Sequence, residues 1–146
     1  MLKTSRVPLI SLLLAVAGLA VSIYLTIAHY STTDLLVCAE NTLVDCASVT
    51  SSDQSKLLGI PVADLGTAFY AFLTLLCLPQ AWRSTNPWIG WARLGSVGVG
   101  VLMVVYLIAA EVFLIGKICL WCTVVHVITL ALAALLVTAE LRASNV

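Results

Sequence analysis

Residues 119–141 form the run CLWCTVVHVITLALAALLVTAEL, in which Glu140 is the only charged side chain. Coiled as an α-helix with a rise of about 1.5 Å per residue, this run crosses the hydrocarbon core of a bilayer, which is about 30 Å thick. Similar apolar runs cover about residues 7–29, 62–82 and 94–115, and none shows the alternation of a strand. The four runs predict an all-α fold, an integral membrane four-helix bundle.

The composition of the whole chain agrees with this prediction. Of its 146 residues, 62% are hydrophobic and 10% are charged. A soluble domain of this size could not bury so much apolar surface, because small domains have a high ratio of surface to volume. Seven basic and seven acidic residues balance, so no basic face for nucleic acid is expected. Without a repeat or a shift in composition, residues 1–146 are predicted to form a single membrane domain.

The distribution of basic residues predicts the orientation. The polar segment 31–59 joins the first two runs and the turn 116–118 joins the last two, so both lie on one face of the membrane. That face has only Lys56 and Lys117, whereas the other has Lys3, Arg6, Arg83, Arg93 and Arg142. Cytoplasmic segments carry the excess of Lys and Arg. We expect a multi-pass protein of the plasma membrane (inner membrane in bacteria) with cytoplasmic termini and segment 31–59 as one long extracytoplasmic loop.

A Cys-x-x-Cys motif, Cys119 to Cys122, stands where the fourth helix starts on that outer face. First-turn amide groups and the positive end of the helix dipole favour thiolate there. Two cysteines three apart on a helix lie on the same side, close enough for an exchangeable disulfide. The motif could instead form a static disulfide, or a zinc site built from all four outer cysteines with no nearby histidine except His29.

A second pair, Cys38 and Cys46, lies in the outer loop. If the loop moves across the mouth of the bundle, this pair can exchange with the Cys-x-x-Cys pair in a two-stage relay. A bond between Cys38 and Cys46 could instead only close the loop. Cys77 is expected mid-way along the second helix, where a thiol is a small apolar filler.

Two ionisable residues lie near the outer face. His126 follows Cys122 by one helical turn, where it could hydrogen-bond or protonate a quinone oxygen, or simply be satisfied between helices. Glu111 falls toward the outer end of the third helix. A carboxyl group at membrane depth is a functional candidate, although it could also pair with a neighbouring helix.

The chain resembles the vitamin K epoxide reductase family, in its bacterial branch, over nearly its whole length. The resemblance rests on VDCASV (44–49) with Ser51 and Ser52, on GIPV (59–62) running into Leu65-Gly66, and on EVFLIGKICLWC (111–122). The last of these stretches is the most specific. Two positions depart from the family pattern: Val62 stands where many members have an asparagine, and His126 where the mammalian enzymes have a tyrosine.

The resemblance implies a role for each site residue. Cys122 is expected to face the quinone, Cys119 to be its exchange partner, and Cys46 and Cys38 to pass oxidation outward. Ser52 corresponds to a family hydroxyl beside the quinone site, of the ubiquinone or menaquinone type. Bacterial members oxidise a thioredoxin-like partner that is sometimes fused to the same chain. No such domain follows Val146, so a separate extracytoplasmic thioredoxin-like protein is expected.

The leading hypothesis is therefore a thiol-quinone oxidoreductase that makes disulfides for extracytoplasmic proteins. In it, a partner dithiol reduces the loop disulfide and electrons pass through Cys119 and Cys122 to a quinone, which supplies the redox chemistry. The same residues could instead reduce a quinone or its epoxide with external thiols. The sequence is also compatible with a non-enzymatic membrane assembly factor or a metal-handling helix bundle.

Overall fold

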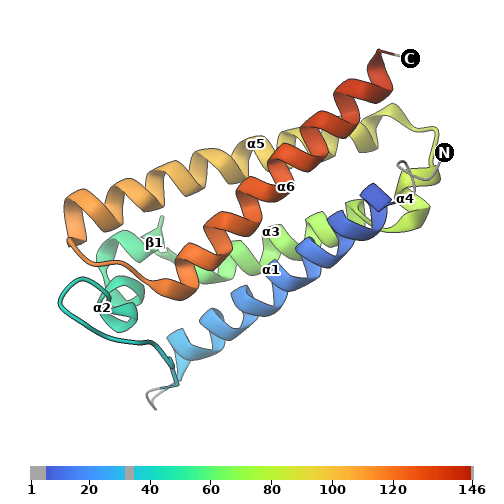
Figure 1. The fold of residues 1–146 in the computed structure, drawn as a ribbon. Coiled ribbons are helices and arrows are strands. Elements are labelled where there is room, and N and C mark those ends of the chain that lie inside the picture. The colour runs from blue at the N-terminus through green and yellow to red at the C-terminus, as the bar shows by residue number, and fades with distance from the viewer. Residues whose placement is uncertain (1–5, 32–34, 146) are drawn as a thin grey trace.

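The computed structural model describes residues 6–31 and 35–145, and the prediction of an all-α membrane bundle is confirmed. Four helices form the bundle in Figure 1: α1 (Arg6–Tyr30), α3 (Val62–Leu76), α5 (Pro87–Ala109) and α6 (Leu120–Ser144). Helix α1 packs against α3 and α6, and α5 packs against α6 and, less extensively, α3. The start of α1 and the end of α6 lie at the same end of the bundle (Figure 1).

Within the described part of the chain, three helical segments are long and apolar enough to span a membrane: Arg6–Tyr30, Pro87–Ile115 and Leu120–Ser144. Helix α3 has 15 residues, a length of only about 22 Å. We expected this helix to reach Trp82, but it ends at Leu76 and a short helix, α4 (Pro79–Arg83), follows. Pro79 is the reason, because proline disfavours helical geometry in the preceding residue, and Leu78 is extended with ψ 146°.

Helix α5 starts earlier in the chain than the expected residue 94. Asn86 accepts a hydrogen bond from the amide of Trp88 at 3.0 Å, and Pro87 takes the first helical position, where a missing N–H costs nothing. Trp88 and Trp91 are both exposed on this first part of the helix. Such tryptophans are typical of the membrane–water interface, which explains why an apolar-run criterion missed them.

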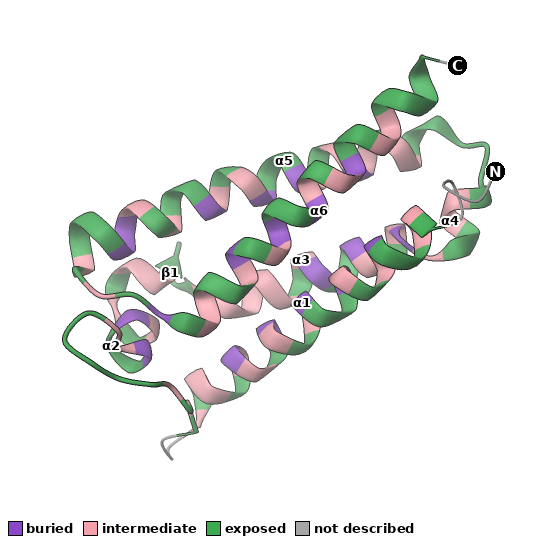
Figure 2. Cartoon of the chain, viewed as in Figure 1, coloured by how far each residue is buried: buried purple, intermediate pink, exposed green. Residues whose placement is uncertain are grey.

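Small side chains on α1 set how closely it approaches α3. Its buried positions are Ser11, Ala15, Gly18, Ser22 and Leu25. A Cβ atom at Gly18 would overlap the ring of Tyr70, so only glycine allows this contact. Many apolar side chains of the long helices are exposed, as expected for a protein whose solvent is lipid, and Figure 2 shows exposed residues along these helices.

The outer loop is an ordered cap in its described part. It contains α2 (Cys46–Ser51), the 3-10 turn η1 (Asp53–Ser55), and a hairpin of β1 (Lys56–Leu57) and β2 (Ile60–Pro61). The hairpin turns at Leu58 and Gly59, both with positive φ. Asp45 caps α2 by accepting hydrogen bonds from the amide and hydroxyl of Ser48. These bonds hold the pKa of Asp45 below its usual value.

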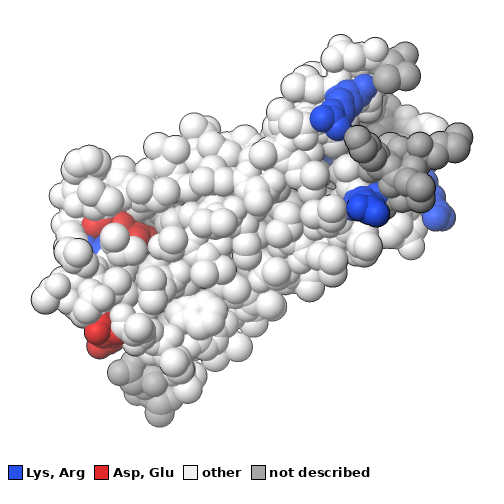
Figure 3. Space-filling model, in the orientation of Figure 1, with Lys and Arg blue, Asp and Glu red and all other residues white. Residues whose placement is uncertain are grey.

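Charges separate along the bundle axis. In Figure 3 most of the visible basic side chains lie near the end of the bundle where α1 begins, whereas the acidic ones, with a little basic surface beside them, lie toward the opposite end. Arg93 is buried among the helices, where it pairs with Glu140 at 2.9 Å and stacks on the Trp82 ring at 3.7 Å. Lys3, which supported the predicted orientation, and Asp34 of the outer loop lie outside the described residues.

Candidate active site

A backbone bridge fastens the outer loop to the start of α6. The amide of Asp45 donates to the carbonyl of Ile118 at 3.0 Å, and the amide of Ile118 donates to the carbonyl of Leu43 at 2.8 Å. Lys117 adds a hydrogen bond from Nζ to the carbonyl of Thr42 at 2.7 Å. Cys46 directly follows Asp45 and Cys119 directly follows Ile118, so this pairing brings the two cysteine motifs together.

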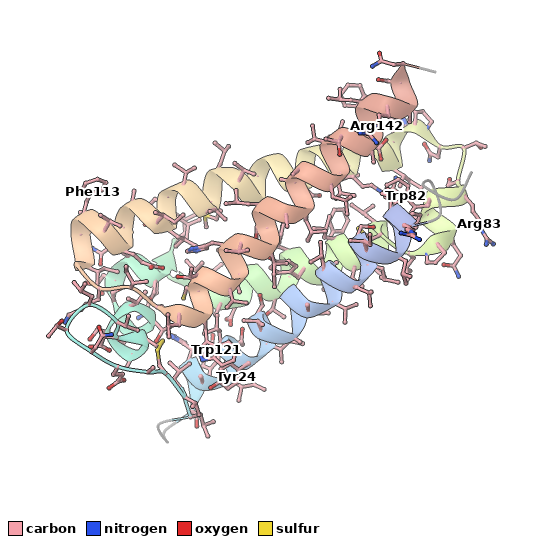
Figure 4. The ribbon with its side chains drawn as sticks, in the orientation of Figure 1. Tyr24, Trp82, Arg83, Phe113, Trp121 and Arg142 are labelled. Carbon is pink, nitrogen blue, oxygen red and sulfur yellow. A yellow bond between two sulfur atoms is a disulfide. The ribbon has the colours of Figure 1, made fainter. Side chains whose placement is uncertain are left out.

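Four cysteines meet at this end of the bundle. Cys38 and Cys46 form a disulfide beside α2, whereas Cys119 and Cys122 are free (Figure 4). Cys46 and Cys119 are fully buried in one cluster with Val49, and Cys38, Trp121 and Cys122 pack against it. An oxidised pair and a reduced pair therefore share one packed cluster, an arrangement that suits thiol–disulfide exchange.

Cys119 caps the N-terminus of α6. Its Sγ accepts a hydrogen bond from the amide of Cys122 at 3.3 Å, and its own amide donates to Oε2 of Glu111 at 3.4 Å. The hydrogen bond from the side chain of Cys122 is the main cause that lowers the pKa of the Cys119 thiol; burial and the charge of Glu111 oppose it. Cys119 is thus the cysteine at which a thiolate is favoured.

A cavity of about 500 Å³ opens among the helices beneath the loop. Its walls are mostly apolar and come from all four long helices, η1 and the hairpin. Cys122 lines it, whereas Cys119 does not. The Cys-x-x-Cys motif thus has one sulfur in the loop cluster and the other at the cavity, which has the size and lining of a site for a small aromatic molecule.

The polar side chains that line the cavity differ in their hydrogen bonds. His126 lines it and is 5% exposed, and no other described residue hydrogen-bonds to its ring. Ser52 also lines it, with its hydroxyl donating to the carbonyl of Val49 at 2.8 Å. Deeper in, the hydroxyls of Tyr70 and Thr129 are 2.7 Å apart. The structure therefore brings Ser52 of the loop to the same cavity as Cys122 and His126, which lie one turn apart on α6.

An aromatic clamp holds the loop segment that precedes Cys38. Tyr24 of α1 and Trp121 meet edge to face at 5.0 Å (Figure 4). Trp121 donates from Nε1 to the carbonyl of Val37 at 2.8 Å, and the Tyr24 hydroxyl accepts from the amide of Val37 at 3.0 Å. Sequence reasoning missed Tyr24; its only signal was an aromatic residue in the outer half of the first run.

Glu111 lies within a π-helical segment, η2 (Ala110–Ile115), that continues α5. The segment ends at Gly116, which has a φ of 70° and donates from its amide to the carbonyl of Glu111 at 2.8 Å. The side chain of Glu111 is 6% exposed and lines the cavity. A π-helical turn inserts an extra residue and re-aims side chains, and such turns are frequent at functional sites.

Cys77 occupies a different part of the molecule from the other cysteines. It is the fully buried C-terminal cap of α3, in a cluster that includes Ala15 and Leu73, and not a mid-helix residue as expected. Within residues 6–31 and 35–145, no group of three or more His, Cys, Asp or Glu side chains is placed to hold a metal ion.

The chain matches a known protein family over most of its length. A family model described as "Vitamin K epoxide reductase family" matches residues 9–137. That range contains all five cysteines, Glu111 and His126. No curated protein matches the chain.

Proposed function

Because this chain belongs to the vitamin K epoxide reductase family and is a multi-pass membrane thiol-quinone oxidoreductase, we propose that it makes disulfides for extracytoplasmic proteins. A partner dithiol reduces the Cys38–Cys46 disulfide and leaves as a disulfide. The two loop thiols then reduce a Cys119–Cys122 disulfide and re-form their own bond. Finally the Cys119 and Cys122 thiols reduce a quinone: two S–H bonds break, one S–S bond forms, and the quinone leaves as quinol.

The observation that carries this proposal is the separation of the two sulfurs of the Cys-x-x-Cys motif. Cys119 is buried in a cluster with Cys46, and Cys122 lines the cavity. Exchange needs direct contact between sulfurs, and quinone reduction needs a sulfur at the quinone. Cys119 is thus the exchange sulfur and Cys122 the quinone-side sulfur.

The cavity supports a quinone of the ubiquinone or menaquinone type. Its apolar walls suit a planar ring, and an isoprenoid tail can extend into lipid. His126 and Ser52 supply polar contacts for the quinone oxygens. His126 has unused ring nitrogens within the described part of the chain, whereas the Ser52 hydroxyl already donates to Val49 and can only accept.

The partner is a separate extracytoplasmic protein with a thioredoxin-like dithiol, as the resemblance to the bacterial branch suggests. Cys38 supports this order, because it is partly exposed and follows Val37, which is 81% exposed. Cys46 is fully buried, so the partner attacks Cys38 first. The loop lies outside and the termini lie in the cytoplasm. Arg83, Arg142 and the first residue of α1, Arg6, stand at the terminal end of the bundle, and cytoplasmic segments carry the basic excess.

Electron flow in the opposite sense uses the same residues. In that case external thiols would drive reduction of a quinone or its epoxide, and the reduced quinone, not a protein disulfide, would be the useful product. Family membership disfavours a non-enzymatic assembly factor and a metal-handling bundle, because members of the family are oxidoreductases.

The test is quinone reduction by the purified protein. The full chain in detergent micelles is mixed with a reduced thioredoxin and decylubiquinone or menadione, and quinol is followed by absorbance. Turnover is expected for the wild type and for Cys77→Ala, and none for Cys122→Ala. No turnover by a folded wild type, with thioredoxin or dithiothreitol, contradicts the proposal. Faster reduction of a quinone epoxide than of the quinone favours an epoxide reductase driven by external thiols.

A further inference from the structure

Glu111 joins the cysteine cluster to the cavity. Its carboxylate accepts from the amide of Cys119 and also lines the cavity that Cys122 and His126 line. Among the described residues no hydrogen bond reaches its second oxygen, Oε1, although the side chain is only 6% exposed. A carboxyl group at membrane depth that faces an apolar cavity is costly, which calls for a reason beyond packing.

The apolar surroundings of Glu111 limit the number of negative charges that can exist together at this place. The titratable side chains that line the cavity are His29, Tyr70, Glu111, Cys122 and His126, and no Lys or Arg lines it. On α2, which packs against η2, the only cysteine is already in a disulfide. Two adjacent negative charges in apolar surroundings repel strongly, so one of the pair keeps its proton. A Cys119 thiolate and an ionised Glu111 therefore oppose one another.

Quinone reduction requires that protons as well as electrons reach the cavity. Two thiols lose two electrons and two protons, and the quinone gains both. Cys119 does not line the cavity, so its proton needs a carrier to reach the quinone, whereas Cys122 lines the cavity directly. Of the two cysteines, only Cys119 has no direct route by which its proton can reach the quinone.

We propose that Glu111 carries the thiol proton of Cys119 to the quinone. The inference rests on the proposed function. Ionised Glu111 takes the proton as the Cys119 thiolate forms. The Cys122 sulfur, which gives up its own proton, bonds to the quinone, and the Cys119 thiolate then attacks that sulfur: the S–S bond forms, the sulfur–quinone bond breaks, and its electron pair stays on the quinone. Glu111 then gives its proton to one quinone oxygen, and the Cys122 proton goes to the other. Glu111 ends ionised again, ready for the next cycle.

Glu111→Gln separates this role from simple positioning. Glutamine keeps the size and an acceptor for the Cys119 amide, but it cannot take a proton. The fully reduced protein is mixed with decylubiquinone and single-turnover reduction is followed, with Glu40→Gln, an exposed loop residue, as the matched control. We expect a rate about 100-fold lower in Glu111→Gln, the usual contribution of a positioned acid or base, and a wild-type rate in Glu40→Gln.

A second variant guards against a packing defect. In Glu111→Ala, added formate can fill the space and restore a proton carrier, so a formate-dependent rate supports the inference. A rate within about threefold of wild type in Glu111→Gln, or a slow Glu111→Gln combined with a folded Glu111→Ala that formate does not accelerate, overturns it. Reduction of the Cys38–Cys46 disulfide by dithiothreitol stays at the wild-type rate in both variants. Absence of quinone reduction in the wild type would instead reject the proposed function itself.

Discussion

The amide of Asp45 donates a 3.0 Å hydrogen bond to the carbonyl of Ile118, and this bond sets Cys46 beside Cys119. Neither bridged residue carries chemistry of its own. Their pairing joins segments more than 70 positions apart in the chain, so the proposed relay would depend on a backbone contact that the side chains do not reveal.

Ile118→Pro should slow the relay by removing half of this bridge. Proline has no amide to donate to Leu43, and one hydrogen bond contributes about 1 kcal/mol, or about fivefold in an equilibrium. We expect transfer from the loop thiols to the Cys119–Cys122 disulfide to slow about fivefold or more, measured by quenched-flow alkylation. Ile118→Val keeps the amide and should behave as wild type; equal rates in both variants would show that the bridge is dispensable.

The pH dependence of Cys119 alkylation should report its hydrogen bond to Cys122. The pKa of Cys119 is lowered mainly by the side chain of Cys122, so alkylation by iodoacetamide should be half-maximal at a lower pH than for the same thiol in the unfolded protein. Because the Cys119 thiol has a lower pKa in the folded than in the unfolded protein, its ionisation stabilises the fold at pH values above the unfolded-state pKa. This stabilisation is lost as the pH falls through the folded-state pKa.

Two substitutions at Cys122 test whether its side chain lowers the pKa of the Cys119 thiol. Cys122→Ala removes the side-chain donor and should raise the midpoint for Cys119, while Cys122→Ser keeps a hydroxyl donor and should raise it less. Peptide mass mapping identifies the alkylated residue. A midpoint that is the same in wild type and Cys122→Ala would contradict the assigned hydrogen bond.

The fold was largely predictable from the sequence, because a membrane helix requires a long run of apolar residues and little else. The helix ends were less predictable. Pro79 ends α3 within an apolar run, and the Asn86-Pro87 cap starts α5 among tryptophans that an apolar criterion excludes. In both cases a local backbone preference decided the boundary and hydrophobicity did not.

Cys77→Ala should leave activity unchanged. The thiol is buried at the end of α3, outside both the cysteine cluster and the cavity. Removing one buried sulfur should cost about 1 kcal/mol of unfolding free energy, seen as a small fall in Tm. Loss of quinone reduction comparable to that in Cys122→Ala would mean that Cys77 belongs to the relay.

Paired surface cysteines should establish the orientation. Leu58, at the hairpin tip, is 96% exposed and Trp88, at the start of α5, is 75% exposed. In intact cells a membrane-impermeant maleimide should label Leu58→Cys and not Trp88→Cys, and inside-out vesicles should reverse the pattern. Labelling of Trp88→Cys alone in intact cells would place the termini outside.

The site was predictable only in part. The cysteines, His126 and Ser52 could be singled out by residue type, spacing and resemblance. Their assembly around one cavity depends on the Ile118 bridge and on the π-helical turn that directs Glu111 inward. Backbone pairing between distant segments and a single inserted helical residue leave no periodic signal, so neither could be inferred from the chain alone.

The order of the relay is tested most directly by non-reducing peptide mapping of Cys122→Ser and Cys119→Ser. In Cys122→Ser, Cys119 is a lone thiol buried with Cys46, and its attack on the loop disulfide gives a Cys46–Cys119 mixed disulfide and a free Cys38 thiol. The mixed disulfide should accumulate relative to the wild type because Cys122 is no longer there to release Cys46. In Cys119→Ser, Cys122 should stay at the cavity without a loop adduct. A Cys46–Cys122 adduct in Cys119→Ser, with none at Cys119 in Cys122→Ser, would contradict the assigned roles.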